Sequence, residues 1–135
     1  MLENMAFLYI EDDPSNCKLM QLMMTRLVKV GHLFIFDDST DFIDRLTDLD
    51  PKPDVILMDI HVKPLNGFDM LPLIRQLPHY QATPVIALTA VINDRELAQI
   101  KTAGFDGMIS KPLSMSVFPM LLQEIANGDS VWYIV

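Results

Sequence analysis

Short apolar runs, each about as long as a β-strand, alternate five times along this chain with longer amphipathic stretches, and this alternation constrains the fold most. The runs are nearly continuous in apolar residues, which is typical of strands buried on both faces of a parallel sheet. They are expected at Ala6–Ile10, His32–Phe36, Val55–Met58, Val85–Leu88 and Met108–Ile109. The pattern predicts an α/β fold in which a doubly wound, five-stranded parallel sheet carries helices on both faces.

Capping residues and helix breakers divide the stretches between these runs. A Ser, Asp or Asn side chain accepts a hydrogen bond from the free N–H groups at a helix start, and Gly favours a helix end. The expected caps are Asp13, Ser39 and Asn93, the last with Glu96 at capping-box spacing, and the expected ends are Gly31 and Gly104.

Two prolines lie inside stretches that are otherwise helical. Pro72 falls in the third expected helix, and Pro119 falls in the last one, which is expected at Ser114–Ala126. Because proline lacks the N–H that a helix interior uses, the sequence predicts a local bend at each position.

Length and composition limit the classes of protein that this chain can belong to. Its 135 residues, half of them hydrophobic, suit one domain over residues 1–135 that folds alone, with an apolar tail at residues 129–135. The net charge of −8 argues against direct binding to nucleic acid. No apolar run approaches membrane-spanning length, and Cys17 is the single cysteine, so a cytoplasmic protein without a membrane partner is expected.

Polar groups follow four of the predicted strands where those strands end. Glu11, Asp12 and Asp13 follow the first run, Asp59 the third, Thr89 the fourth and Lys111 the fifth. Each residue alone has an ordinary structural explanation, such as a helix cap or a turn. The carboxyl ends of parallel strands share one edge of the sheet, however, so these groups are expected to form one cluster.

The charges of this cluster favour a divalent cation. Glu11, Asp12 and Asp59 carry three negative charges and Lys111 carries one positive charge. The surplus would raise the carboxyl pKa values unless a cation offsets it. Oxygen ligands of this kind favour Mg²⁺, so the sequence predicts a magnesium site.

The same groups suit phosphoryl transfer to a carboxylate. The transition state of this reaction spreads charge over three oxygens, which the metal, the Thr89 hydroxyl and the Lys111 ammonium could each contact. Asp59 is then the expected in-line nucleophile.

With these residues in place, the chain resembles the receiver domain of two-component response regulators over nearly its whole length. The fold implied is the flavodoxin-like (βα)5 arrangement of single-domain, chemotaxis-type receivers. The resemblance depends on the segments Leu8-Tyr-Ile-Glu-Asp-Asp13, Val55-Ile-Leu-Met-Asp-Ile60 with Asn66-Gly67, Ala87-Leu-Thr-Ala90 and Ser110-Lys-Pro112, and on the spacing between Asp59, Thr89 and Lys111.

The resemblance implies a phosphoacceptor domain rather than an enzyme, although such domains catalyse their own phosphorylation and slow dephosphorylation. Asp59 is implied to take a phosphoryl group from a sensor histidine kinase or a histidine phosphotransfer protein. Output would come through altered binding of a protein target, at the face built from the fourth helix, fifth strand and fifth helix, with a shift of Ala90–Asn93. A homodimer is left open.

The resemblance also implies roles for the surrounding residues. Glu11 and Asp12 correspond to the acidic pair that holds Mg²⁺ with Asp59, and the backbone carbonyl of His61 completes that set. Thr89 corresponds to the switch hydroxyl and Lys111 to the phosphoryl-contacting lysine. The peptide bond before Pro112 is expected to be cis, and Asp13 is preferred as a helix cap over a metal ligand.

Two departures from the family pattern affect the expected switch. Met108 stands where the family usually has an aromatic residue, and Pro64 comes one position later than is common. They leave open a receiver-like interaction module that does not depend on phosphorylation. A phosphatase of the haloacid dehalogenase type is disfavoured because His61 replaces the required second Asp, and a flavin-binding protein is disfavoured because no phosphate loop follows the first strand.

Overall fold

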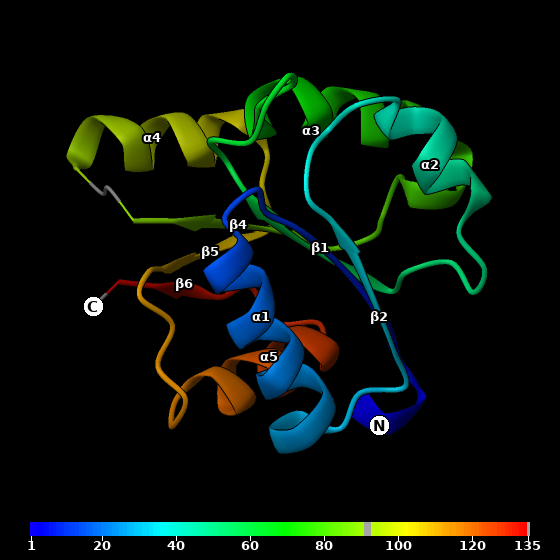
Figure 1. Cartoon of the computed structure of the whole chain (residues 1–135). Helices are drawn as coiled ribbons and strands as arrows, with labels where there is room; N and C mark the ends of the chain where they lie inside the picture. The colour runs from blue at the N-terminus through cyan, green and yellow to red at the C-terminus, as the bar shows by residue number, and fades with distance from the viewer. Residues whose placement is uncertain (91–92, 135) are drawn as a thin grey trace.

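A computed structural model describes residues 1–90 and 93–134 of the chain. The described residues form one parallel sheet of six strands in the order β2-β1-β3-β4-β5-β6 (Figure 1). The strands are β1 (Ala6–Ile10), β2 (His32–Phe36), β3 (Val55–Asp59), β4 (Val85–Thr89), β5 (Gly107–Ser110) and β6 (Trp132–Tyr133). The strand order reverses between β1 and β3, so the predicted doubly wound fold is confirmed.

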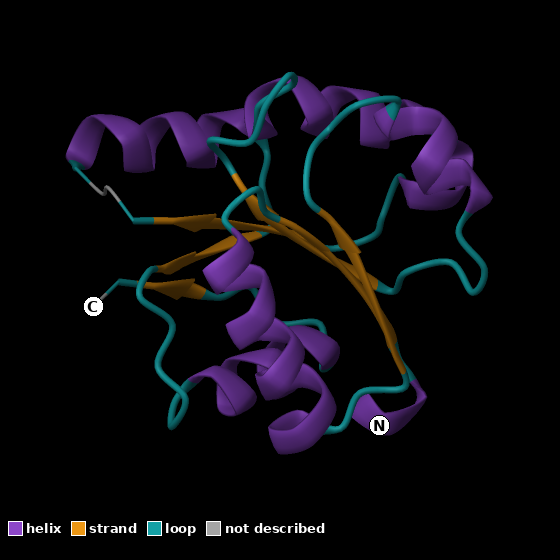
Figure 2. Ribbon diagram, in the orientation of Figure 1, coloured by secondary structure: helices purple, strands orange, loops and turns teal. Residues whose placement is uncertain are grey.

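Helices cover both faces of the sheet. Figure 2 shows α2, α3 and α4 on one face and α1 with α5 on the other. Their bounds are α1 (Pro14–Leu22), α2 (Phe42–Asp48), α3 (Gly67–Gln76), α4 (Asp94–Ala103) and α5 (Phe118–Ala126). A π-helical turn at Met23–Val28 extends α1, and short 3-10 turns lie at Leu2–Asn4 and Pro78–Tyr80. None of the described helices is both long and apolar enough to cross a membrane.

The core consists of one apolar layer on each face of the sheet. The layer under α2, α3 and α4 includes Phe42, Leu46 and Ile74, and all three are buried. The opposite layer lies under α1 and α5, and it includes Met20, Met23 and Met24. Met108 of β5 is fully buried in the layer under α2, α3 and α4, so it belongs to the core.

Several predicted helix ends are confirmed. Asp13 caps α1 by accepting a hydrogen bond from the Ser15 N–H, and Pro14 is the first helical residue. Asn93 caps α4 through the Glu96 N–H, and α4 ends at Gly104, whose φ of 98° favours glycine. The Lys111–Pro112 peptide bond is cis, as expected.

Two predicted helix ends are wrong. Lys29, in the left-handed region at φ 63°, terminates the first helical segment in place of Gly31. Gly31 is instead required by a close approach, because a Cβ there would lie 2.7 Å from the Glu3 carbonyl oxygen. Ser39 does not cap α2, which begins after Asp41 without a side-chain cap.

The last helix is shorter than predicted. It begins at Phe118, because Ser114 starts a separate turn in which its carbonyl accepts the Val117 and Phe118 N–H groups. Pro119 is therefore in the first turn of α5, where its missing N–H costs no helical hydrogen bond. The bend predicted at Pro119 thus has no basis. Pro72 does lie inside α3, which continues to Gln76.

The apolar tail adds a sixth strand to the five that the sequence predicts. Met108 donates its N–H to the Val131 carbonyl at 2.7 Å, and Trp132 pairs with Met108 in parallel register. The Lys101 ammonium of α4 lies 5.3 Å from the centre of the Trp132 ring. The Ser130 hydroxyl donates to the Asp106 carbonyl at 2.7 Å. The tail is thus fixed to the edge of β5 by backbone and side-chain contacts.

Gly107 provides a test of how β6 is held. A Cβ at this position would lie 2.4 Å from the Val131 carbonyl oxygen, so Gly107→Ala must push β6 away from β5. We expect the variant to lose about 1 to 3 kcal/mol of stability, measured by urea unfolding. The Met108 amide should lose its protection from hydrogen exchange, while the Lys111 amide, bonded to Thr89, should keep it. Equal protection of both amides in the variant would contradict this account.

Candidate functional site

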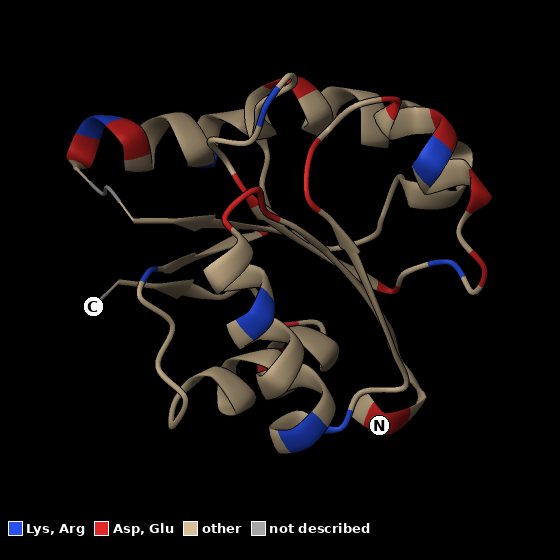
Figure 3. Ribbon diagram, in the orientation of Figure 1, with Lys and Arg blue, Asp and Glu red and all other residues tan. Residues whose placement is uncertain are grey.

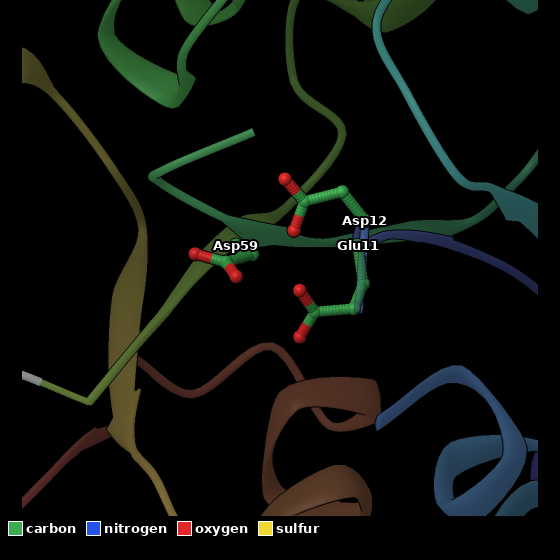
Figure 4. A group of neighbouring side chains, drawn as sticks. All are labelled: Glu11, Asp12 and Asp59. Atoms are coloured by element: carbon green, nitrogen blue, oxygen red, sulfur yellow. The ribbon is translucent and has the colours of Figure 1, made fainter. Parts of the chain in front are cut away.

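Three carboxylates meet at the carboxyl ends of β1 and β3. Ile10 of β1 is in register with Met58 of β3, so the residues that follow them, Glu11 and Asp59, emerge side by side. Figure 4 shows the carboxylates of Glu11, Asp12 and Asp59 gathered in one place. One oxygen of each lies within 4.8 Å of the others. The predicted acidic cluster is therefore present.

Glu11 is the most enclosed of the three acids, with 1% exposure. Its Oε1 accepts hydrogen bonds from the Tyr9 hydroxyl at 3.0 Å and from Asn16 Nδ2 at 3.1 Å. Lys111 Nζ lies 2.5 Å from the same oxygen. A buried carboxylate needs partners of this kind to offset its lost hydration. The sequence does not predict the roles of Tyr9 and Asn16. Tyr9 points to the same side of β1 as Glu11, because the two residues are two positions apart. Asn16 lies in the first turn of α1.

Asp59 is held from two sides. Lys111 Nζ lies 2.9 Å from Oδ2, and the His61 backbone N–H donates to Oδ1 at 3.0 Å. The carboxylate is 11% exposed, so a reacting group can still reach it. Lys111 thus bridges the two buried acids, and the structure brings Glu11, Asp59 and Lys111 into direct contact.

The contacts among Glu11, Asp59 and Lys111 shift the pKa of each group. Burial raises the pKa of Glu11, and the neighbouring Asp59 adds to this shift against the opposing effect of Lys111. Burial alone would also raise the pKa of Asp59, but hydrogen bonds with Glu11, the His61 N–H and Lys111 outweigh it, so its pKa is lowered. The two acids together hold the pKa of Lys111 above its usual value, against the effect of burial. The lowered pKa favours an ionised Asp59, which is the form that a nucleophile requires.

Asp12 completes the acidic edge from an exposed position. Figure 3 shows acidic segments at the ends of β1 and β3 and a basic segment at the end of β5. An exposed carboxylate beside two buried ones leaves one side of the cluster open to solvent. Oxygen donors arranged in this way fit a hard cation that keeps several waters, as Mg²⁺ does. The residues present therefore fit the metal that the charges predict.

Thr89 and His61 contact a residue that the sequence did not single out for chemistry. Thr89 is the last residue of β4, and its hydroxyl lies 3.3 Å from Glu96 Oε1. The His61 imidazole Nε2 lies 3.3 Å from the same oxygen. The His61 side chain thus points toward α4, and its N–H supports Asp59. The sequence predicts Glu96 only as part of a capping box with Asn93. Its contact with Thr89 joins two residues whose spacing in the sequence gives no sign of an interaction.

Ser39 supports the loop that follows β3. Its hydroxyl donates to the Leu65 carbonyl at 2.7 Å and accepts from the Leu65 N–H at 2.6 Å. The next residue, Asn66, forms a reciprocal capping box with Asp69 at the start of α3. The path from Asp59 to α3, including the shifted Pro64, is therefore tied to the loop after β2.

Comparison with known proteins identifies the type of domain. The family model described as "Response regulator receiver domain" matches residues 7–123. The chain is 30% identical over 127 residues, or 94% of its length, to the signal transduction histidine-protein kinase BarA of Escherichia coli, of which it spans 13%. It is 31% identical over 108 residues, or 80% of its length, to stress response regulator protein 1 of Meyerozyma guilliermondii, of which it spans 49%. The chain thus spans less than half of each of these curated relatives.

Solved structures show the same fold at lower identity. The signal receiver domain of a DNA binding response regulator from Colwellia psychrerythraea superposes with a TM-score of 0.80 at 23% identity, covering 92% of this chain and 99% of that one. The receiver domain of sensor histidine kinase PA1611 from Pseudomonas aeruginosa, described with a magnesium ion coordinated in its active site cleft, has a TM-score of 0.77 at 24% identity. It covers 90% of this chain and 96% of that one.

Magnesium should stabilise the folded chain through the acidic cluster. At a concentration one hundred times the dissociation constant, the gain is about 2.7 kcal/mol, which thermal unfolding detects as a higher Tm. Asp12→Asn should reduce this gain, because it removes a charged oxygen donor without leaving a buried group unpaired. Asp44→Asn, at an exposed position on α2, serves as the control and should keep the full gain. Equal gains in the two variants would contradict the metal site.

The Lys111 bridge predicts how stability changes at alkaline pH. Because the folded pKa of Lys111 is raised, its contribution is present below the unfolded value of 10.5 and is lost as the pH rises through the folded value. The stability advantage of wild type over Lys111→Met should therefore shrink above about pH 10.5. Urea unfolding of both proteins from about pH 8 upward measures it. A difference that stays constant with pH would contradict the bridge.

Proposed function

Because the chain belongs to the response regulator receiver domain family and is therefore a receiver domain of two-component signalling, we propose that it accepts a phosphoryl group on Asp59 and signals through altered protein binding. The observation that carries this proposal is the partly accessible Asp59 carboxylate in contact with the Lys111 ammonium and close to two further acids. A structural ion pair would not need the exposed third acid, Asp12, on the open side of the cluster.

The chemistry assigns a separate task to each contacting group. An oxygen of the Asp59 carboxylate attacks the phosphorus of a phosphohistidine, the phosphorus–nitrogen bond breaks, and an aspartyl phosphate and a free histidine result. Lys111, already hydrogen-bonded to Asp59, stays within reach of the oxygens of the new phosphoryl group and offsets their charge. The His61 N–H orients the carboxylate through Oδ1.

Glu11, Asp12 and Asp59 would hold Mg²⁺, with the His61 backbone carbonyl as a fourth protein ligand. The bound metal supplies positive charge to the transferring phosphoryl group. Tyr9 and Asn16 fix the Glu11 carboxylate in its buried position, so that the ligand does not have to be ordered when the metal arrives.

Thr89 is proposed as the group that reports phosphorylation. It ends β4, the strand next to β3, and its side chain is buried. Movement of its hydroxyl toward a phosphoryl group on Asp59 would shift the segment between β4 and α4. The predicted shift of Ala90–Asn93 includes residues 91 and 92, which lie outside the described residues.

The phosphoryl donor is proposed to be a sensor histidine kinase or a histidine phosphotransfer protein in the cytoplasm. The relatives named above include a histidine-protein kinase that contains a region similar to this chain. The downstream target is proposed to bind the face built from α4, β5 and α5. In this chain β6 pairs with the edge of β5, so a target at that face would meet β6 between the two helices (Figure 1).

Phosphorylation provides the direct test of the proposal. Treatment with acetyl phosphate and Mg²⁺ should add one phosphoryl group to the wild-type chain, detected by intact-protein mass spectrometry. Asp59→Asn should abolish the addition, because an amide is a poor nucleophile and its phosphoryl adduct cannot form. Removal of Mg²⁺ by a chelator should reduce it strongly.

Asp44→Asn is the matched control, since it removes a carboxylate of the same type from an exposed helix position. It should be phosphorylated like wild type. If wild type gains no phosphoryl group, or if Asp59→Asn gains as much as wild type, the assignment of Asp59 fails. The first result would favour the receiver-like module that acts without phosphorylation.

A further inference from the structure

Glu96 of α4 binds two groups beside the proposed phosphorylation site. Its Oε1 lies 3.3 Å from the Thr89 hydroxyl and 3.3 Å from the His61 Nε2. The Glu96 side chain is 13% exposed, whereas the His61 side chain is 64% exposed, so the carboxylate is much more enclosed than the imidazole that it contacts. One oxygen atom therefore joins the end of β4, the loop after β3 and the first turn of α4.

The backbone of Glu96 is fixed by the helix cap. Its N–H donates to Asn93 Oδ1 at 2.8 Å, which sets the first turn of α4. In α3 the acid at the same position, Asp69, turns back and accepts the Asn66 N–H at 3.1 Å. The longer Glu96 side chain reaches toward the sheet instead. The half of the capping box that would use the Glu96 carboxylate is replaced by its contact with Thr89.

This contact competes with the role proposed for Thr89. A threonine hydroxyl has one proton to donate. While that proton is donated to Glu96, it is not available to an oxygen of a phosphoryl group on Asp59. Thr89 is fully buried, so its side chain has little room to serve both partners at once.

We propose that Glu96 is a positioning residue that holds the Thr89 hydroxyl in its unphosphorylated arrangement. This inference rests on the proposed function of Asp59. Phosphorylation then exchanges the Thr89–Glu96 hydrogen bond for one between Thr89 and the phosphoryl group. Because the first bond ties α4 to β4, its loss releases the first turn of α4 and carries the state of Asp59 to that helix.

The first experiment measures how easily the chain is phosphorylated. Wild type and Glu96→Ala are treated with increasing acetyl phosphate at fixed Mg²⁺, and the phosphorylated fraction is read by intact-protein mass spectrometry. Without the competing bond, half-saturation should require about threefold to tenfold less acetyl phosphate, which is the range expected for the net contribution of a typical intramolecular hydrogen bond. Asp94→Ala removes another acid from the same helix turn at an exposed position and should match wild type.

The second experiment asks whether Glu96 acts through Thr89. In a Thr89→Ala background the hydroxyl is absent, so adding Glu96→Ala should change the half-saturating concentration no further. An equal shift with and without the hydroxyl would overturn the proposal, since a general effect of charge or helix stability would act in both backgrounds. So would a Glu96→Ala protein that behaves like wild type.

A third measurement does not depend on phosphorylation. In the untreated protein, NMR coupling constants report the χ1 torsion of Thr89, whose rotamer populations should differ between wild type and Glu96→Ala. If the χ1 torsion of Thr89 is the same in wild type and Glu96→Ala, this result alone overturns the role proposed for Glu96. If wild type takes no phosphoryl group, the function proposed for Asp59 fails and this torsion still decides whether Glu96 positions Thr89.

Discussion

The ammonium of Lys111, placed between Glu11 and Asp59, is the interaction on which the rest of the site depends. Two carboxylates that are both nearly buried would repel each other and would take up protons. Lys111 comes from the far end of the chain, at β5, and reaches both at 2.5 and 2.9 Å. This bridge allows the ends of β1 and β3 to carry acids at the point where the strand order reverses, and it favours the ionised form of Asp59.

The two acids that Lys111 bridges differ in their other contacts. Glu11 has four hydrogen-bond donors around it in Tyr9, Asn16, Lys111 and the Asp13 N–H, so it is fixed in one position. Asp59 accepts hydrogen bonds from the Lys111 ammonium and the His61 N–H, and its side chain is more exposed than that of Glu11. In the proposed reaction the fixed Glu11 would serve only as a metal ligand, whereas Asp59, which is also a proposed ligand, keeps an accessible edge for attack on an incoming phosphoryl group.

Topology explains how much of this could be predicted from the sequence. Parallel strands place their carboxyl ends on one edge, so the meeting of Glu11, Asp59 and Lys111 follows from the strand assignment alone. The partner of Ser39 could not be predicted, because Leu65 is 26 residues away and only the folded loops bring them together. The contact between Thr89 and Glu96 could not be predicted for a similar reason. The spacing of Asn93 and Glu96 predicts a capping box, but the Glu96 carboxylate contacts the Thr89 hydroxyl instead of the cap backbone. The pairing of the tail with β5 was one of several arrangements that an apolar segment allows.

The C-terminal tail and Thr89 contact opposite ends of α4. Glu96 lies in the first turn of α4 and contacts Thr89, and Lys101 lies in the last turn and contacts the ring of Trp132. A helix of ten residues moves largely as one body, since each turn is bonded to the next. A displacement of α4 at Glu96 would therefore also move Lys101 relative to the Trp132 ring on β6, which pairs with the edge of β5. In this chain, the strand added at the edge of the sheet lies where a change at Thr89 would reach the proposed output face.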